Sequence, residues 1–119
     1  MRFREQHARG VTVICAEGDL VATACSTPLQ SEVKMVLARG ERHIVLNLAG
    51  IGRMDSSCLG EVVASYTSTV ALGGLLNLVA PPDHVRRLLE FTKLDTVIKV
   101  FATDDEAIAD LVTQQGAIL

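Results

Sequence analysis

Residues 44–60, IVLNLAGIGRMDSSCLG, decide the fold of this chain. The apolar run at 44–48 is short enough for a buried strand, as in a parallel sheet. A helix is predicted to begin near Ser56, almost directly after this strand. Its apolar residues recur at helical spacing and form one stripe: Leu59, Val62, Val63, Tyr66 and Val70. The pair Gly73 and Gly74 is expected to end this helix.

Further strands are predicted on both sides of this stretch. Runs rich in apolar and β-branched residues predict strands at 11–16, 75–79 and 97–101. Residues 3–7 are expected to pair antiparallel with the first of these strands, through a turn at residues 8–10. After that strand, residues 17–19 are typical of a turn. Residues 20–22 then form a short strand or bridge.

Capping signals predict three more helices. Thr27 is a hydroxyl N-cap followed by Pro28 at the first helical position, and Gly40 ends this helix. A pair of prolines, Pro81 and Pro82, opens the next helix. The last helix is opened by a capping box of Thr103 and Glu106, and the tail from Gln114 is expected to be loose. The inner faces of the three helices are Leu29, Val33, Val36 and Leu37; Val85, Leu88 and Leu89; and Ile108, Leu111 and Val112.

Alternating strands and helices predict an α/β fold. We expect residues 1–119 to form a single domain with a mostly parallel central sheet of four to six strands. The N-terminal part of this sheet is antiparallel, and about four helices pack on it. With aromatic residues at 3% and no Trp, the core is built from Val, Leu, Ile and Ala.

Composition excludes several classes of function. The formal net charge is −3 and the Lys and Arg residues form no basic stripe, so direct binding of nucleic acid is not expected. The N-terminal residues lack the apolar core of a signal peptide, and no apolar run is long enough to span a bilayer. We therefore expect a cytoplasmic protein without membrane insertion. The three cysteines show no CxxC spacing and the three histidines no metal-binding spacing, so neither a metal site nor a cofactor is predicted.

The residues around Ser56 are the candidate functional site. A hydroxyl at a helix N-terminus lies close to free backbone N–H groups, which suit a phosphate. Ser56 is therefore a candidate for phosphorylation, and a plain N-cap is the alternative. Ser57 is expected to turn towards the helix backbone. Asp55 either orients the Ser56 hydroxyl or forms an Asx-turn.

For three further residues, a role in partner contact is compared with a structural role. Leu59 is either a contact point for a partner or part of the core, and Gly60 is small enough for close approach. Asp19 is either part of the adjacent loop surface or an ordinary turn acid.

The motif Asp55-Ser56-Ser57-Cys58-Leu59-Gly60, after the strand at 44–48, resembles the STAS domain family, and in particular bacterial anti-sigma factor antagonists. The usual string of that family is Asp-Ser-(Ser/Thr)-Gly-Leu-Gly. The resemblance implies that Ser56 is phosphorylated by an anti-sigma factor with serine kinase activity. The unphosphorylated chain would bind that factor and free the sigma factor, and a PP2C-type phosphatase would reset the cycle. The implied partner-binding residues are Asp55, Ser56, Ser57, Cys58, Leu59, Gly60 and Asp19.

The sequence departs from the family pattern at two positions. Val21 stands where the family carries a second acid near the phosphorylation site, and Cys58 replaces a glycine. These departures keep an alternative open, which is a phosphorylation-independent scaffold or adaptor of a stressosome-like or lipid-transport complex. Enzyme activity is not predicted, because there is no Gly-x-Ser-x-Gly elbow and His43 should lie at the opposite end of the sheet from Ser56.

Overall fold

The computed structural model describes residues 1–21 and 28–118, and side chains as far as residue 114. Its strands are β1 (Arg2–Ala8), β2 (Val11–Leu20), β3 (His43–Met54), β4 (Leu75–Val79) and β5 (Val100–Phe101). Its α-helices are α1 (Pro28–Ala38), α2 (Leu59–Ala71), α3 (Asp83–Phe91) and α4 (Asp104–Ile118), and a short 3-10 helix, η1 (Leu94–Thr96), follows α3. The predicted α/β order is confirmed. The expected N-cap Thr27 lies outside the described residues.

The strands form one mixed sheet in the order β1-β2-β3-β4-β5. The first pair is antiparallel and the other three pairs are parallel, as predicted. Residues of α1, α2 and α3 share one core cluster with one face of the sheet, and residues of α4 share a second cluster with the other face. Neighbouring strand residues alternate between these clusters, as with Val13 and Ile14, because successive side chains of a strand point to opposite faces.

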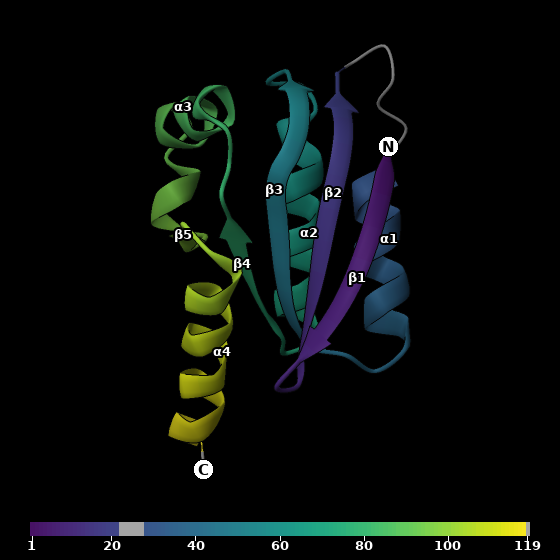
Figure 1. Ribbon diagram of the computed structural model, residues 1–119, viewed down its shortest axis with the longest axis vertical. Helices are drawn as coiled ribbons and strands as arrows, with labels where there is room; N and C mark the ends of the chain where they lie inside the picture. The colour runs from purple at the N-terminus through teal and green to yellow at the C-terminus, as the bar shows by residue number, and fades with distance from the viewer. Residues whose placement is uncertain (22–27, 119) are drawn as a thin grey trace.

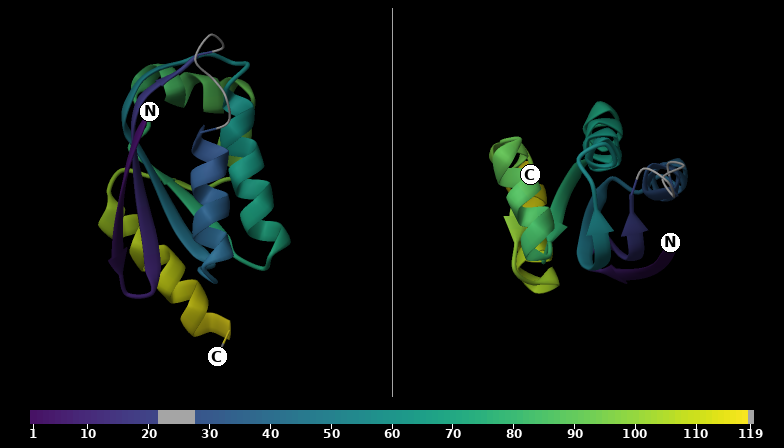
Figure 2. Two further views of the ribbon diagram at one scale, coloured as in Figure 1. Left: turned by 90° about the vertical axis from the view of Figure 1, so that its right-hand side faces the viewer. Right: turned by 90° about the horizontal axis from the view of Figure 1, so that it is seen from above.

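Two strands end and two helices begin at the same end of the molecule. In Figure 1, the strands β2 and β3 end at the top of the view, where α2 begins behind the sheet. Figure 2 shows α1 and α2 side by side, both starting at that end. The carboxyl ends of parallel strands therefore meet the beginnings of α1 and α2 at one edge of the molecule.

The hairpin of β1 and β2 confirms the predicted antiparallel start. Its turn is Arg9 and Gly10, which both have positive φ angles of 56° and 80°. A two-residue turn with positive φ at both positions matches the right-handed twist of the strands. The register places Ala8 opposite Val11.

The segment after the first predicted strand was wrongly expected to leave the sheet. The predicted turn at residues 17–19 belongs to β2, and Leu20 is the last residue of the same strand rather than part of a separate one. The strand continues because β3 continues beside it to Met54, well past the predicted end at residue 48. Two glycines of β3 permit this pairing. A Cβ at Gly50 would lie 2.8 Å from the Ala16 carbonyl oxygen, and a Cβ at Gly52 would lie 2.5 Å from Asp19 Oδ1.

The C-terminal part differs from the prediction in two ways. The last strand, expected over residues 97–101, comprises only Val100–Phe101, because η1 ends at Thr96 and Val97 is its C-cap. The tail expected to be loose from Gln114 is helical, since α4 extends to Ile118. The opening of α4 agrees with the prediction, because the Glu106 N–H donates to Thr103 Oγ1 at 3.3 Å.

The inward face of α2 also differs from the predicted stripe. Leu59 and Val62 are buried as expected, but Val70 is 44% exposed. Glu61, Ser65 and Thr69 are buried in its place. Their spacing of four residues puts them on one side of the helix, and each hydroxyl donates to the carbonyl four residues earlier. Apolar periodicity alone misses a buried stripe that is polar.

Candidate functional site: the Ser56 turn

Residues 55–58, called here the Ser56 turn, join β3 to α2. The Asp55 N–H donates to the Leu20 carbonyl at 3.1 Å, which ties the turn to the end of β2. Asp55 Oδ1 accepts the Ser57 hydroxyl at 2.7 Å and the Cys58 N–H at 3.1 Å. One carboxylate thus holds the next three residues in a tight turn, as an Asx-turn does. Ser57 bonds to Asp55, not to the helix backbone as predicted.

Ser56 itself is exposed, and its hydroxyl has no hydrogen-bond partner among the described residues. The helix predicted to begin near Ser56 begins slightly later, at Leu59, and its N-cap is Cys58. The N-cap alternative for Ser56 fails for this reason. Ser56 is therefore displayed on a turn whose shape is held by the residues on either side of it.

The predicted partner-binding residues differ in their access to solvent. Ser56, Ser57 and Gly60 are exposed, and a Cβ at Gly60 would meet no atom within 4 Å. Leu59 and Cys58 are buried, with Cys58 only 2% exposed and packed in the core cluster. The backbone of Cys58 is in the ordinary helical region, with φ −90° and ψ −10°. Its side chain thus points into the domain and away from the surface that presents Ser56.

Asp19 lies at the same end of the sheet. It is the second-last residue of β2 and is exposed, and its carboxylate lies against Gly52 of β3. Asp19 Oδ2 is 3.9 Å from Nε of the exposed Arg53. The structure therefore brings Asp19 to the end of β3 that carries the Ser56 turn. It lies within a strand and is not a turn acid.

Sequence reasoning missed Glu61, the third residue of α2. Its side chain is 5% exposed, and Oε1 accepts the N–H of Leu29 at 3.1 Å and of Gln30 at 3.4 Å. These N–H groups belong to the first turn of α1, where helix donors lack intrahelical partners. The sequence offers one weak signal for this contact, which is the spacing of Glu61, Ser65 and Thr69 on one face.

A second cluster of charged side chains lies at the opposite end of the sheet. His7 Nε2 is 3.0 Å from Glu41 Oε1 and 3.8 Å from Glu5 Oε1, so these three side chains have a spacing that could hold a metal ion. Both carboxylates are already paired with the guanidinium of Arg39. His43 begins β3 at this end, as predicted, and burial lowers the pKa of its imidazole.

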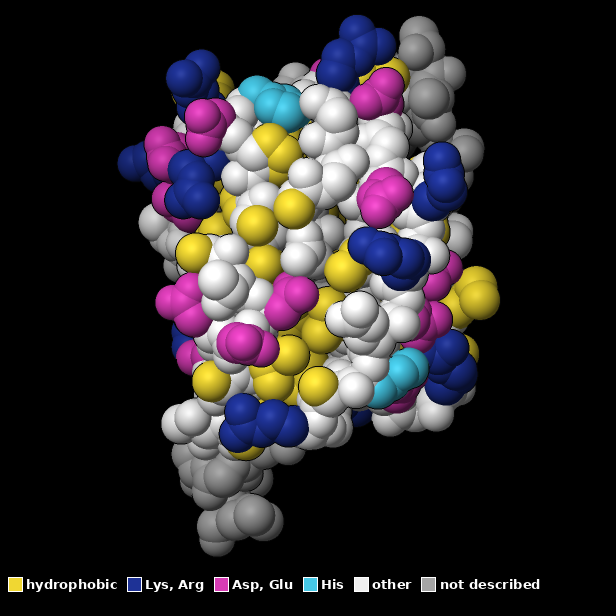
Figure 3. Space-filling view, in the orientation of Figure 1, with side chains coloured by type: hydrophobic (Ala, Val, Ile, Leu, Met, Phe, Trp, Pro, Cys, Tyr) yellow, Lys and Arg dark blue, Asp and Glu magenta, His cyan; other side chains and the backbone are white. Residues whose placement is uncertain are grey.

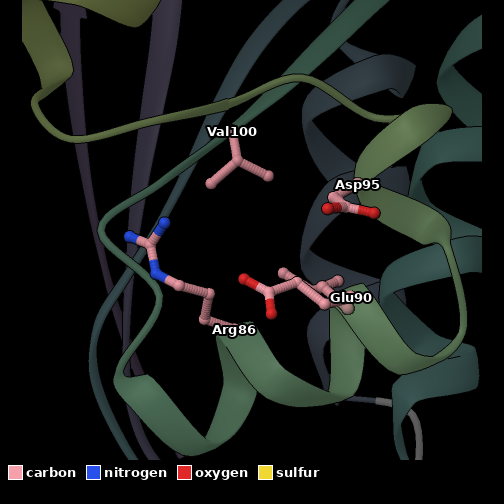
Figure 4. A pocket seen from close by; sticks show the side chains of 5 residues that line it. Arg86, Glu90, Asp95 and Val100 are labelled. Atoms are coloured by element: carbon pink, nitrogen blue, oxygen red, sulfur yellow. The ribbon is translucent and has the colours of Figure 1, made fainter.

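One hollow of the surface is separate from the Ser56 turn. It has a volume of about 260 Å³ and lies between α3, η1 and β5, where Leu89 also contributes to the wall. In Figure 4, Arg86 lies across the hollow from Asp95, and Glu90 and Val100 also border it. No predicted site residue lines it.

The face of the sheet that α1 and α2 do not cover carries charges of both signs. Figure 3 shows basic and acidic side chains interspersed over this face, with apolar side chains between them. Among the described residues, no helix is both long and apolar enough to cross a bilayer.

Comparison with known proteins identifies the family. A sequence model of the STAS domain matches residues 3–107, and this range includes all of the Ser56 turn. The chain belongs to the STAS domain family. The resemblance carried by the motif at 55–60 is thus confirmed.

Relatives of this STAS chain include proteins named as anti-sigma factor antagonists. The TM1081 homolog of Thermotoga neapolitana is 35% identical over 75 residues, which are 63% of this chain and 66%, just under two thirds, of that relative. The anti-sigma F factor antagonist of Paenibacillus polymyxa is 27% identical over 113 residues, covering 93% of this chain and 95% of the relative.

Solved structures show the same fold. The unphosphorylated form of the anti-sigma factor antagonist SpoIIAA superposes with a TM-score of 0.71 at 27% identity, over 90% of this chain and 93% of the other. The phosphorylated form of SpoIIAA from Bacillus superposes with a TM-score of 0.68 at 25% identity, over 92% of this chain and 98% of the other.

Proposed function

We propose that this chain is a cytoplasmic anti-sigma factor antagonist that is switched by phosphorylation of Ser56. In the unphosphorylated state it binds an anti-sigma factor with serine kinase activity and thereby frees a sigma factor. Phosphorylation of Ser56 by that partner ends the binding, and a PP2C-type phosphatase restores it. The chain acts by binding and not by catalysis. Within the STAS domain, the partner surface consists of the exposed residues Ser56, Ser57, Gly60 and Asp19. Asp55 shapes the turn, and Cys58 and Leu59 support it from the core.

The observation that carries this proposal is the exposure of Ser56 on a turn held by Asp55. A kinase needs a hydroxyl that it can reach, and the bonds of Ser57 and Cys58 to Asp55 leave the Ser56 hydroxyl accessible. The names of the relatives support the role, and SpoIIAA is known in both an unphosphorylated and a phosphorylated form.

The size of the expected switch follows from electrostatics. A phosphate adds about −1.5 to −2 charges. In the free domain, the positive end of α2 favours such a charge by about 0.3–1 kcal/mol. At a packed interface, an unpaired charge costs about 2–5 kcal/mol, which weakens binding about 30-fold to several thousand-fold. The interface can therefore carry the switch without a change of fold.

The test is mass spectrometry of the chain recovered from its own host, with and without phosphatase treatment, for wild type, Ser56→Ala and Ser57→Ala. We expect a phosphate on Ser56 in the wild type and in Ser57→Ala, and none in Ser56→Ala. The Ser56→Ala chain should hold its partner permanently, and Ser56→Asp should release it while keeping the fold by circular dichroism. A chain that is never phosphorylated across growth and stress conditions contradicts the proposal and supports the constitutive scaffold.

A further inference from the structure

We propose that Glu61 is a positioning residue for phosphorylation of Ser56, because it fixes the first turn of α1 beside the Ser56 turn. The inference rests on the proposed function. It adds that the kinase partner contacts both segments, so that Glu61 acts on recognition without touching the partner.

The contact of Glu61 is unusual in its burial and in its targets. Glu61 is the one charged side chain among the buried residues that the structure describes. A buried carboxylate is costly unless it is hydrogen-bonded, and here it accepts N–H groups of Leu29 and Gln30 in α1. A carboxylate at the N-terminus of a helix also interacts favourably with the helix dipole. Glu61 therefore does for α1 what an N-cap does, although it belongs to a different helix.

The same residue is linked to the Ser56 turn through the backbone. The Glu61 N–H donates to the Cys58 carbonyl at 3.0 Å, and the Cys58 N–H donates to Asp55. A continuous series of hydrogen bonds thus connects Asp55, Cys58, Glu61 and the first turn of α1. Figure 2 shows the two helices side by side with their starts at the same end of the molecule.

Two segments that lie far apart in the sequence thus begin at the same end of the molecule (Figure 2). Ser31 in α1 is exposed, and so are Ser56 and Gly60 at the start of α2. A partner large enough to bring a kinase site to Ser56 will meet the start of α1 as well. If Glu61 no longer holds α1, the partner must order that segment during binding, so affinity falls while the chemistry at Ser56 is unchanged.

The experiment compares Glu61→Gln, Glu61→Ala and Ser65→Ala with wild type. The kinase is the fraction of host extract that phosphorylates the wild-type chain on Ser56. Glu61→Gln keeps an acceptor oxygen of the same reach, and Glu61→Ala removes it. Ser65→Ala is the matched control, because Ser65 is buried on the same face of α2 and its hydroxyl donates to the Glu61 carbonyl, within α2.

We expect the KM for Ser56 phosphorylation to rise about tenfold in Glu61→Ala, equivalent to about 1.4 kcal/mol, and less in Glu61→Gln. The kcat should change by less than about twofold, and Ser65→Ala should keep the wild-type KM even where it lowers the melting temperature. Faster amide exchange at Leu29 and Gln30 should accompany the effect in both Glu61 variants.

An unchanged KM in Glu61→Gln, together with faster exchange at Leu29 and Gln30, would overturn the inference, and this variant decides the matter if Glu61→Ala does not fold. An equal rise of KM in Ser65→Ala would also overturn it, because general loosening of α2 would then explain the effect. If no extract fraction phosphorylates wild-type Ser56, the proposed function fails first, and the inference fails with it.

Discussion

Cys58 shows how a departure from a family pattern is explained at the scale of one residue. It stands where the family string has glycine, yet its backbone is in the ordinary helical region and its side chain is buried in the core. The position does not need the conformational freedom of glycine. The cysteine therefore fills space beneath the Ser56 turn and leaves the surface around Ser56 open.

This reading predicts the effect of restoring the family residue. Cys58→Gly removes a buried side chain and puts the most flexible residue at a position with ordinary helical φ and ψ, so we expect it to lower the free energy of unfolding by about 1–3 kcal/mol, measured by urea denaturation. Cys58→Ala, which leaves only the cavity effect, should cost less. Phosphorylation of Ser56 should keep its kcat/KM. Faster phosphorylation of Cys58→Gly without loss of stability would show instead that the cysteine obstructs the kinase.

At this scale, the sequence predicts the exposed hydroxyl but not the residue that orders its surroundings. Asp55, Ser56 and Ser57 are adjacent, so local turn chemistry indicates that a turn exists there. Glu61 bonds to residues of α1 that lie about thirty positions earlier in the chain. An acid in the first turn of a helix is common for reasons of the helix dipole, so its burial against another helix cannot be read from its position.

At the scale of elements, replacing Gly60 should have opposite effects on the stability of α2 and on partner binding. It lies in the first turn of α2, and a Cβ there would meet no atom within 4 Å. Alanine favours a helix over glycine by about 1 kcal/mol. Gly60→Ala should therefore raise the melting temperature of the free chain, measured by calorimetry.

The same variant should weaken partner binding, because we propose that Gly60 allows close approach at the interface. Gly73→Ala is the contrasting variant. That residue has a φ of 82° beyond the end of α2, so alanine there should destabilise the chain. A Gly60→Ala chain that is more stable and still binds its partner with full affinity would remove Gly60 from the interface.

The sequence predicts well those elements that are fully buried and whose ends are marked by neighbouring residues in the chain. The strand β4 matches its predicted bounds, because the apolar run at 75–79 is enclosed by a glycine pair and a proline pair. The extension of β3 to Met54 was missed, because its pairing depends on β2 continuing beside it. The shortened β5 was missed because η1 takes up residues with strand-like composition. Long-range pairing decided the first case and a local 3-10 helix the second, and strand propensity reports neither.

At the scale of the whole molecule, the sheet separates two ends with different tasks. The end with the carboxyl termini of β2 and β3 carries the Ser56 turn, Asp19 and the start of α1. The other end is closed by an ion-pair network that joins β1, β2 and the connection between α1 and β3. In this network Glu41 accepts the Thr12 hydroxyl and pairs with Arg39 and His7, and Arg39 also pairs with Glu5. At the Ser56 end, the exposed side chains of Asp19 and Arg53 form a looser pair, with 3.9 Å between Asp19 Oδ2 and Arg53 Nε.

This division predicts that acid loosens the end of the molecule that lies away from Ser56. Burial alone would raise the pKa of Glu41, but the hydrogen bonds from Thr12 and Arg39 and the charges of Arg39 and His7 outweigh it and hold this pKa below its ordinary value of 4.5. A carboxyl whose folded pKa is depressed stabilises the fold above its unfolded pKa, and this contribution is lost as the pH falls through the folded pKa. The free energy of unfolding should therefore decrease as the pH is lowered below about 4.5.

In Glu41→Gln, urea denaturation should show a smaller free energy of unfolding at pH 7 and a flatter decline of that free energy towards pH 3. Glu90→Gln, which changes an exposed carboxylate of α3 outside these ion pairs, should keep the wild-type pH dependence. Equal slopes for wild type and Glu41→Gln would mean that the network does not hold this end together, and that acid acts elsewhere in the domain.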